Sequence, residues 1–161
     1  MNIKKITIFI ILFWMFIVGF FVFQNQLIIE TGQEVSLKTR PVDPRDLLRG
    51  DYVVLNYEIN TFDNKDRIPS NTEVYVTLVK NVDGTSSIKE VLTEKPKNEE
   101  LFIKGKTGKY YRPRNIVYGI ENYFVKEKTG RELERNLRKE NSYVKVSVDK
   151  KGNARIKEIG Y

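Results

Sequence analysis

The strongest pattern along the chain is an uninterrupted apolar run near its N-terminus. Residues 6–23 are eighteen consecutive uncharged residues, most of them large and apolar, directly after Lys4 and Lys5. As a helix, this run is about 27 Å long, which is enough to cross a hydrocarbon core of about 30 Å. A segment this apolar on every face is typical of a membrane-spanning helix rather than of a helix inside a soluble domain.

The residues that flank this run predict its orientation and its fate. Lys4 and Lys5 are expected to stay in the cytoplasm, so that the rest of the chain lies on the other side of the membrane. A cleaved signal peptide is the alternative, but it needs small residues at the cut, and the run ends in Phe20, Phe21, Val22 and Phe23. We therefore predict an uncleaved signal-anchor. The expected division is a cytoplasmic tail at 1–5, a transmembrane helix at 6–23, a juxtamembrane linker at 24–34 and an extracytoplasmic domain at 35–161.

After the anchor, apolar and polar positions alternate with the period of β-strands. The clearest example is 51–59, where one face of the predicted strand carries Val53, Leu55, Tyr57 and Ile59. Residues 27–29 either prolong the first helix or begin a strand. Further strands are predicted at 35–39, 73–80, 87–92, 101–103, 110–118, 143–148 and 154–159, with tight turns at 83–84 and 149–153.

The only helix predicted after the anchor begins at Thr129 and ends near Asn141. Glu132 follows Thr129 by three residues, which is the spacing of a capping box, and Leu133 and Leu137 share one helical face. The fold class is therefore mainly β, or a β-rich α+β fold. We expect the transmembrane helix to be followed by a small β-sandwich or partly open barrel of about seven short strands, with a helix at 130–140 that covers one end or edge.

Composition removes several classes of catalytic site. The chain has no cysteine and no histidine, which excludes thiol and Ser-His-Asp catalysis and any zinc site built on those ligands. We predict no metal site and no cofactor. The net charge of +7 comes from 28 basic and 21 acidic residues that are well mixed, with no block of five like charges. We do not expect nucleic acid to be a partner.

Residues 50–57 read GDYVVLNY, which resembles the signature of the GDYxxLxY family at all five fixed positions. The preceding residues 41–49 and two later blocks, 118–125 and 129–134, are similar to the same family in the same order. The resemblance implies a membrane-anchored prokaryotic protein of a kind that is often encoded beside polytopic membrane proteins. It implies no established biochemical activity.

The charged residues around this motif allow two interpretations. In the structural one, Gly50 ends a turn, the nearby charges pair with one another, and Tyr52, Leu55 and Tyr57 pack on the two faces of a strand. In the functional one, the family-like blocks converge and their carboxylates and guanidinium groups line a cleft for a polar ligand or a charged partner segment. The candidate ligand- or partner-binding residues are Asp43, Arg45, Asp46, Arg49, Asp51, Tyr52, Tyr57, Glu121, Arg131 and Glu134.

We expect the chain to be a single-pass, membrane-anchored, extracytoplasmic binding or assembly subunit rather than an enzyme. Its expected partners are the membrane, which one helix crosses, and a polytopic membrane protein. One alternative is an anchored envelope hydrolase that uses a carboxylate pair including Asp51 or Glu121. Another is an electrostatic adaptor that binds anionic lipid or polymer through basic residues gathered on one side.

Overall fold

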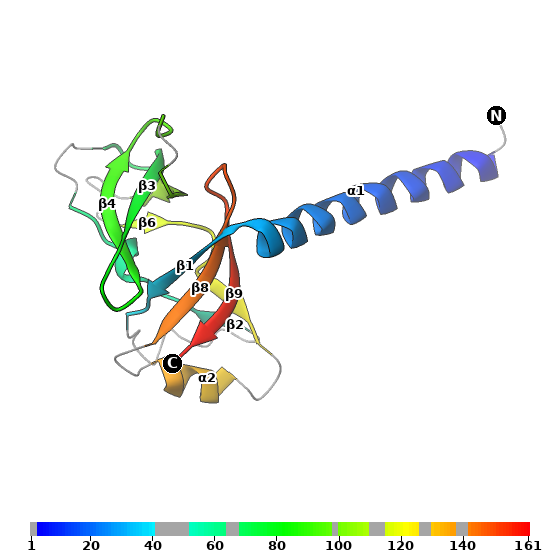
Figure 1. Cartoon of the computed structure of the whole chain (residues 1–161). Helices are drawn as coiled ribbons and strands as arrows, with labels where there is room; N and C mark the ends of the chain where they lie inside the picture. Colours follow the sequence, from blue (N-terminus) through cyan, green and yellow to red (C-terminus); the bar gives the residue numbers. More distant parts are fainter. Residues whose placement is uncertain are drawn as a thin grey trace.

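The computed structural model describes residues 3–40, 52–63, 68–97, 100–109, 115–125, 130–137 and 142–161. For four of these residues only the backbone is described: Tyr52, Arg131, Glu132 and Glu134. A single long helix projects from a β-rich domain, with the N-terminus at its far end (Figure 1). The elements are α1 (Ile3–Thr31), β1 (Gln33–Lys38), β2 (Tyr52–Val54), the 3-10 helix η1 (Glu58–Asn60), β3 (Glu73–Lys80), β4 (Ser86–Leu92), β5 (Phe102–Thr107), β6 (Ile116–Val117), β7 (Asn122–Phe124), α2 (Gly130–Leu137), β8 (Tyr143–Val148) and β9 (Ala154–Gly160).

Helix α1 is longer than the apolar run that predicts it. It has 29 residues, so it is about 43 Å long, and none of its residues is buried. The helix continues through residues 27–29, which decides between the two alternatives for this segment. Of the predicted linker at 24–34, residues 24–31 are helical, and Gly32 alone separates α1 from β1. The domain therefore begins directly where the helix ends.

Seven strands form one curled sheet in the order β6-β5-β3-β4-β1-β8-β9. Neighbours pair antiparallel, except that β1 and β4 are parallel. The curl brings the two ends of the sheet together, because the backbone N–H of Lys104 in β5 donates to the carbonyl of Gly152 in the β8–β9 turn at 2.8 Å. The architecture is a half-barrel (Figure 1). It corresponds to the partly open barrel, one of the two predicted forms.

The core lies on the inner side of this curled sheet. The alternation of strand side chains places one face of each strand inward, and the separate two-stranded ribbon β2–β7 contributes to the same hydrophobic cluster. As the sequence pattern predicts, the whole apolar face of 53–59 is buried, with 0 to 2 % exposure for each residue. The other buried apolar residues include Val35, Leu37, Val74, Val76, Ile103, Ile116, Val144, Val146 and Val148.

Several predicted boundaries differ from the observed ones. The strand predicted at 51–59 ends at Val54, and η1 occupies 58–60 because the side chain of Asn60 accepts the backbone N–H of Tyr57 and tightens the chain into a turn. The strand predicted at 101–103 extends to Thr107 in β5, and the one at 110–118 is described only as β6. The hairpins at 73–92 and 143–160 match their predictions closely. The predicted helix is present as α2, while Thr129 and residues 138–141 lie outside the described residues.

Two side-chain hydrogen bonds fix the C-terminal end of α1 against the β8–β9 hairpin. The hydroxyl of Ser147 donates to the carbonyl of Ile28 at 2.6 Å, and Arg155 Nε donates to Asn25 Oδ1 at 2.7 Å. Gly32 permits this close approach, because a Cβ there would collide with the Ser147 hydroxyl and with the carbonyls of Ile28 and Val148. The helix is consequently packed against β8 and β9 rather than hinged to them.

This packing predicts that two Gly→Ala substitutions differ in their effect on the free energy of unfolding. Gly32→Ala should destabilise the folded chain by about 1–3 kcal/mol, because the added methyl group overpacks the junction against backbone atoms that have little room to move. Gly19→Ala is the matched control, because a Cβ at Gly19 meets nothing within 4 Å. The measurement is the free energy of unfolding of the detergent-solubilised full chain in denaturant. Equal effects of the two substitutions would contradict the tight junction.

Candidate functional site

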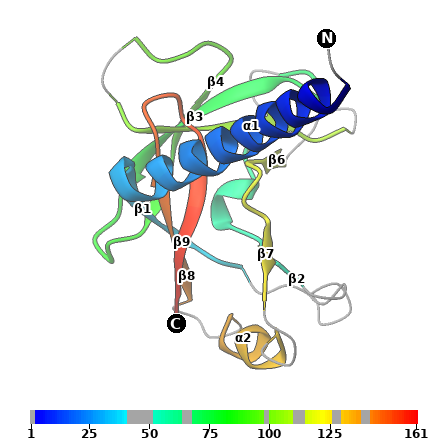
Figure 2. The same ribbon diagram turned by 90° about the vertical axis from the view of Figure 1, so that its right-hand side faces the viewer.

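The described part of the family motif pairs with the second family-like block. Strand β2 lies antiparallel to β7, with Tyr52 opposite Phe124 and Val54 opposite Asn122. The backbone N–H of Leu55 then donates to the carbonyl of Glu121 at 2.7 Å, which continues the contact beyond the strand. The third block contributes α2, which lies beside β2 (Figure 2). The described residues of the three blocks thus lie next to one another, which is the arrangement that the cleft interpretation requires.

Tyr57 is a structural residue of this junction. Its side chain is fully buried, and its hydroxyl donates to the carbonyl of Ile120 at 2.7 Å. Burial raises the pKa of the Tyr57 phenol, and the negative charge of nearby Glu121 raises the pKa further. The phenol therefore stays neutral, and in this position it serves as a buried hydrogen-bond donor that holds the 118–121 turn.

Glu121 braces the same turn from the other side. One carboxylate oxygen accepts the backbone N–H of Tyr118 at 2.6 Å, and the other accepts the N–H of Gly119 at 2.8 Å. Gly119 has a φ of 82°, a left-handed conformation that glycine adopts without strain. A turn with two inward-pointing N–H groups suits a carboxylate acceptor, so both oxygens of Glu121 are occupied by the protein itself.

Asn60 and Tyr118 complete the network, and the sequence did not single them out. The amide of Asn60 donates to the carbonyl of Ile116 at 2.7 Å and lies 3.3 Å from Glu121 Oε1. The Tyr118 hydroxyl donates to the carbonyl of Ile59 at 2.6 Å. Burial raises the pKa of the Tyr118 phenol, and the negative charge of Glu121 raises it further. Tyr57 and Tyr118 therefore tie η1 and the 118–121 turn together in both directions.

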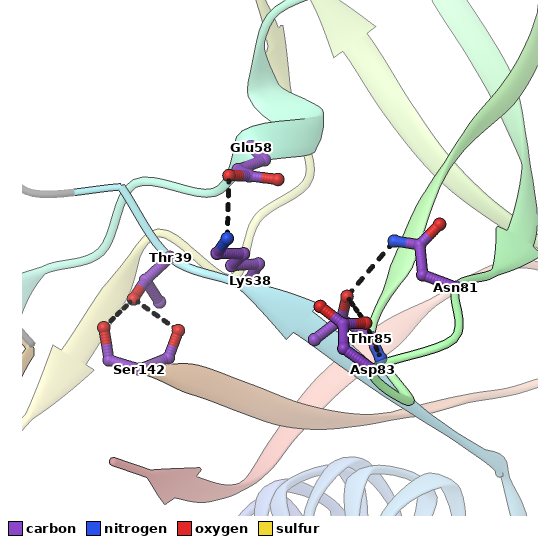
Figure 3. A network of polar contacts seen from close by, with 7 residues as sticks. All are labelled: Lys38, Thr39, Glu58, Asn81, Asp83, Thr85 and Ser142. Atoms are coloured by element: carbon purple, nitrogen blue, oxygen red, sulfur yellow. Dashed lines mark hydrogen bonds and ion pairs between the residues drawn. The ribbon is translucent and has the colours of Figure 1, made fainter. Parts of the chain in front are cut away.

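A second polar cluster joins the end of β1 to the start of β8. The Thr39 hydroxyl donates to the carbonyl of Ser142 at 3.0 Å and lies 2.6 Å from the Ser142 hydroxyl, which itself donates to the last carbonyl of α2, that of Leu137, at 2.9 Å. Ser142 is only 1 % exposed. Lys38 forms an ion pair of 3.8 Å with Glu58 on the surface nearby (Figure 3). This cluster connects α2 to the sheet and was also missed from the sequence.

The remaining candidate residues are only partly placed. Asp43, Arg45, Asp46, Arg49 and Asp51 lie outside the described residues, and the charged cleft predicted from them stays a prediction. Tyr52 sits on β2, while Arg131 and Glu134 sit on α2, each described by its backbone. Among the described residues, no group of three or more acidic side chains is arranged to hold a metal ion.

Comparison with known proteins identifies the family. The chain matches the sequence model of the GDYXXLXY protein over residues 14–159. It belongs to the GDYXXLXY family. The match includes most of α1 and all of the β domain except its last two residues, so the helix and the half-barrel belong to the family together. No curated protein and no solved structure is significantly similar to the chain.

The hydrogen bond of Tyr57 predicts a specific loss of stability. Tyr57→Phe should destabilise the chain by about 1–3 kcal/mol, because it leaves the buried Ile120 carbonyl without its donor. Tyr123→Phe is the matched control, since the described residues offer no hydrogen-bond partner to the Tyr123 hydroxyl on the neighbouring strand, and it should change stability by less than about 0.5 kcal/mol. Chemical unfolding of both variants measures the difference. A Tyr57→Phe variant as stable as the Tyr123→Phe control would contradict a structural role for the last tyrosine of the motif.

Proposed function

We propose that this GDYXXLXY protein is a single-pass, membrane-anchored subunit whose β domain works outside the cytoplasm and binds another membrane protein. The observation that carries the proposal is α1, which is long and apolar enough to span a membrane and leaves its apolar side chains exposed. Phe9, Trp14 and Phe16 are 60 to 72 % exposed, and hydrocarbon is the solvent that favours such a surface.

The direction of the anchor follows from its flanking charges. Lys4 and Lys5 precede the apolar run, and Glu30 is the first charged residue after it. Basic residues beside a spanning segment are retained on the cytoplasmic side, which supports an extracytoplasmic position for the half-barrel.

The contacts of Glu121, one of the two carboxylates named for the hydrolase alternative, favour a binding role for this residue; the other, Asp51, lies outside the described residues. A carboxylate that acts on a glycosidic bond must face the substrate or a water molecule. Both oxygens of Glu121 instead accept hydrogen bonds from the protein backbone. The family-like blocks build a braced ribbon beside α2, and a rigid ribbon of this kind is suited to presenting a surface to a partner.

Recovery of a partner tests the proposed function. The full chain, crosslinked in native membranes and purified in detergent, should bring down a polytopic membrane protein reproducibly. An unrelated single-pass protein treated in the same way is the background control. Purification of the chain alone, under conditions that preserve other membrane complexes, would contradict the assembly role.

A topology control accompanies this purification. Because the chain has no cysteine, a single introduced cysteine is the only thiol that can react with an impermeant maleimide. Its reaction shows on which side of the membrane that residue lies. Lys80→Cys in the exposed part of β3 should react in right-side-out vesicles, and Ile3→Cys at the start of α1 in inside-out vesicles. The reverse pattern would place the domain in the cytoplasm and refute the proposed orientation.

A further inference from the structure

An open groove of about 470 Å³ lies where the two ends of the curled sheet meet. Strands β3 and β5 form one wall, and the β8–β9 hairpin forms the other. The hydrogen bond between Lys104 N and Gly152 O, 2.8 Å long, holds the hairpin turn on β5 and so joins the two walls. The groove is thus a consequence of the fold rather than of a loose surface loop.

The charged side chains that line this groove are three cations and one carboxylate: Glu73, Lys104, Lys106 and Arg155. Lys104 Nζ lies 2.8 Å from Glu73 Oε2, which neutralises one cation. Lys106 stands directly opposite Glu73 in the strand register, is exposed, and has no ion-pair partner within 4.0 Å among the described residues. The groove therefore carries an excess of two positive charges, from Lys106 and Arg155.

Arg155 is held in place by the anchor helix. Its Nε donates to Asn25 Oδ1 at 2.7 Å and its Nη1 donates to the carbonyl of Ala154 at 2.8 Å. A guanidinium group has five N–H donors, so donors remain for an anion after these two bonds. Fixing the side chain in advance lowers the entropy lost when an anion binds.

The contact with Asn25 also sets the depth of Arg155 relative to the membrane. Asn25 lies two residues, or about 3 Å of helical rise, beyond Phe23 at the end of the apolar run. The headgroup layer on each side of a bilayer is about 5–8 Å thick. If residues 6–23 span the hydrocarbon core, Arg155 lies at the level of the lipid headgroups, and the groove that it lines has this end at the base of α1.

We propose that this groove binds the phosphate of an anionic phospholipid headgroup, with Lys106 and Arg155 as its ligands. The inference rests on the proposed membrane anchorage, and it adds a lipid class and two binding residues to it. The bound headgroup would hold the half-barrel against the membrane on the side of β5 and the β8–β9 hairpin. A phosphodiester offers the acceptor oxygens that a guanidinium and an ammonium group recognise together.

Native mass spectrometry of the detergent-solubilised full chain tests this site. With equal amounts of phosphatidylglycerol and phosphatidylcholine added, the unsubstituted chain should retain phosphatidylglycerol preferentially. The double substitution Lys106→Gln and Arg155→Gln should lower its affinity for phosphatidylglycerol about tenfold or more, since each cation near an anionic lipid contributes to binding. Lys106→Glu alone leaves the contact between Arg155 and Asn25 in place, so it tests the site even if the double variant is unstable, and it should lower the affinity as well.

The control removes two exposed cations outside the groove, Lys80→Gln with Lys97→Gln, and should leave the preference intact. Equal losses in the groove and control variants would overturn the site in favour of general charge attraction. Displacement of the lipid by an equal concentration of glycerol 3-phosphate would overturn a lipid source in favour of a soluble phosphate. Retention of the chain in membranes after alkaline carbonate, without any lipid preference, would refute the site alone, whereas its release by carbonate would refute the anchorage and the site together.

Discussion

The attachment of α1 to the β8–β9 hairpin is the constraint on which the rest of the structure depends. The helix passes into β1 through Gly32 alone, and Ser147 and Arg155 bind its last two turns. A helix that is fixed in this way leaves the domain little freedom to rotate or to move away from its base. The same attachment holds Arg155 at the foot of the helix, so the position of the domain relative to α1 and the proposed lipid contact share one physical cause.

The second level of organisation is the braced turn that joins the family blocks. Tyr57 and Tyr118 each donate a buried hydroxyl hydrogen bond to the opposite segment, and Glu121 accepts the N–H groups of the turn itself. Buried networks of this kind are stabilising when every donor and acceptor is paired, and no described buried side-chain atom lacks a hydrogen-bond partner. Two fixed positions of the motif are explained by architecture: Tyr57 by this network, and Leu55 by its burial in the hydrophobic core.

Local patterns predicted the parts of the fold that local physics determines. The hairpins at 73–92 and 143–160 were predictable because strict alternation and turn residues such as Gly84, with a φ of 83°, lie next to each other in the sequence. The end of β2 at Val54 could not be predicted from the local pattern, because it depends on the side chain of Asn60 and on contacts with residues about sixty positions away. The candidate site shows the same division. Glu121 was identified by its charge within a family-like block. Asn60 and Tyr118 gave no sign of their roles, because each donates to a backbone carbonyl more than fifty residues away, and Ser142 gave none because its partner Thr39 lies about a hundred residues away.

The most direct test of the account is the distribution of distances between α1 and the β domain. The chain has no cysteine, so a variant that carries both Thr7→Cys in α1 and Lys80→Cys in β3 takes a spin label at these two sites only. Pulsed electron resonance in nanodiscs then measures the distance between the two labels. A fixed junction predicts one narrow distribution, which a flexible glycine-rich insertion after Thr31 should broaden. A distribution equally broad in the uninserted chain would show that the helix and the half-barrel move independently and would contradict the account.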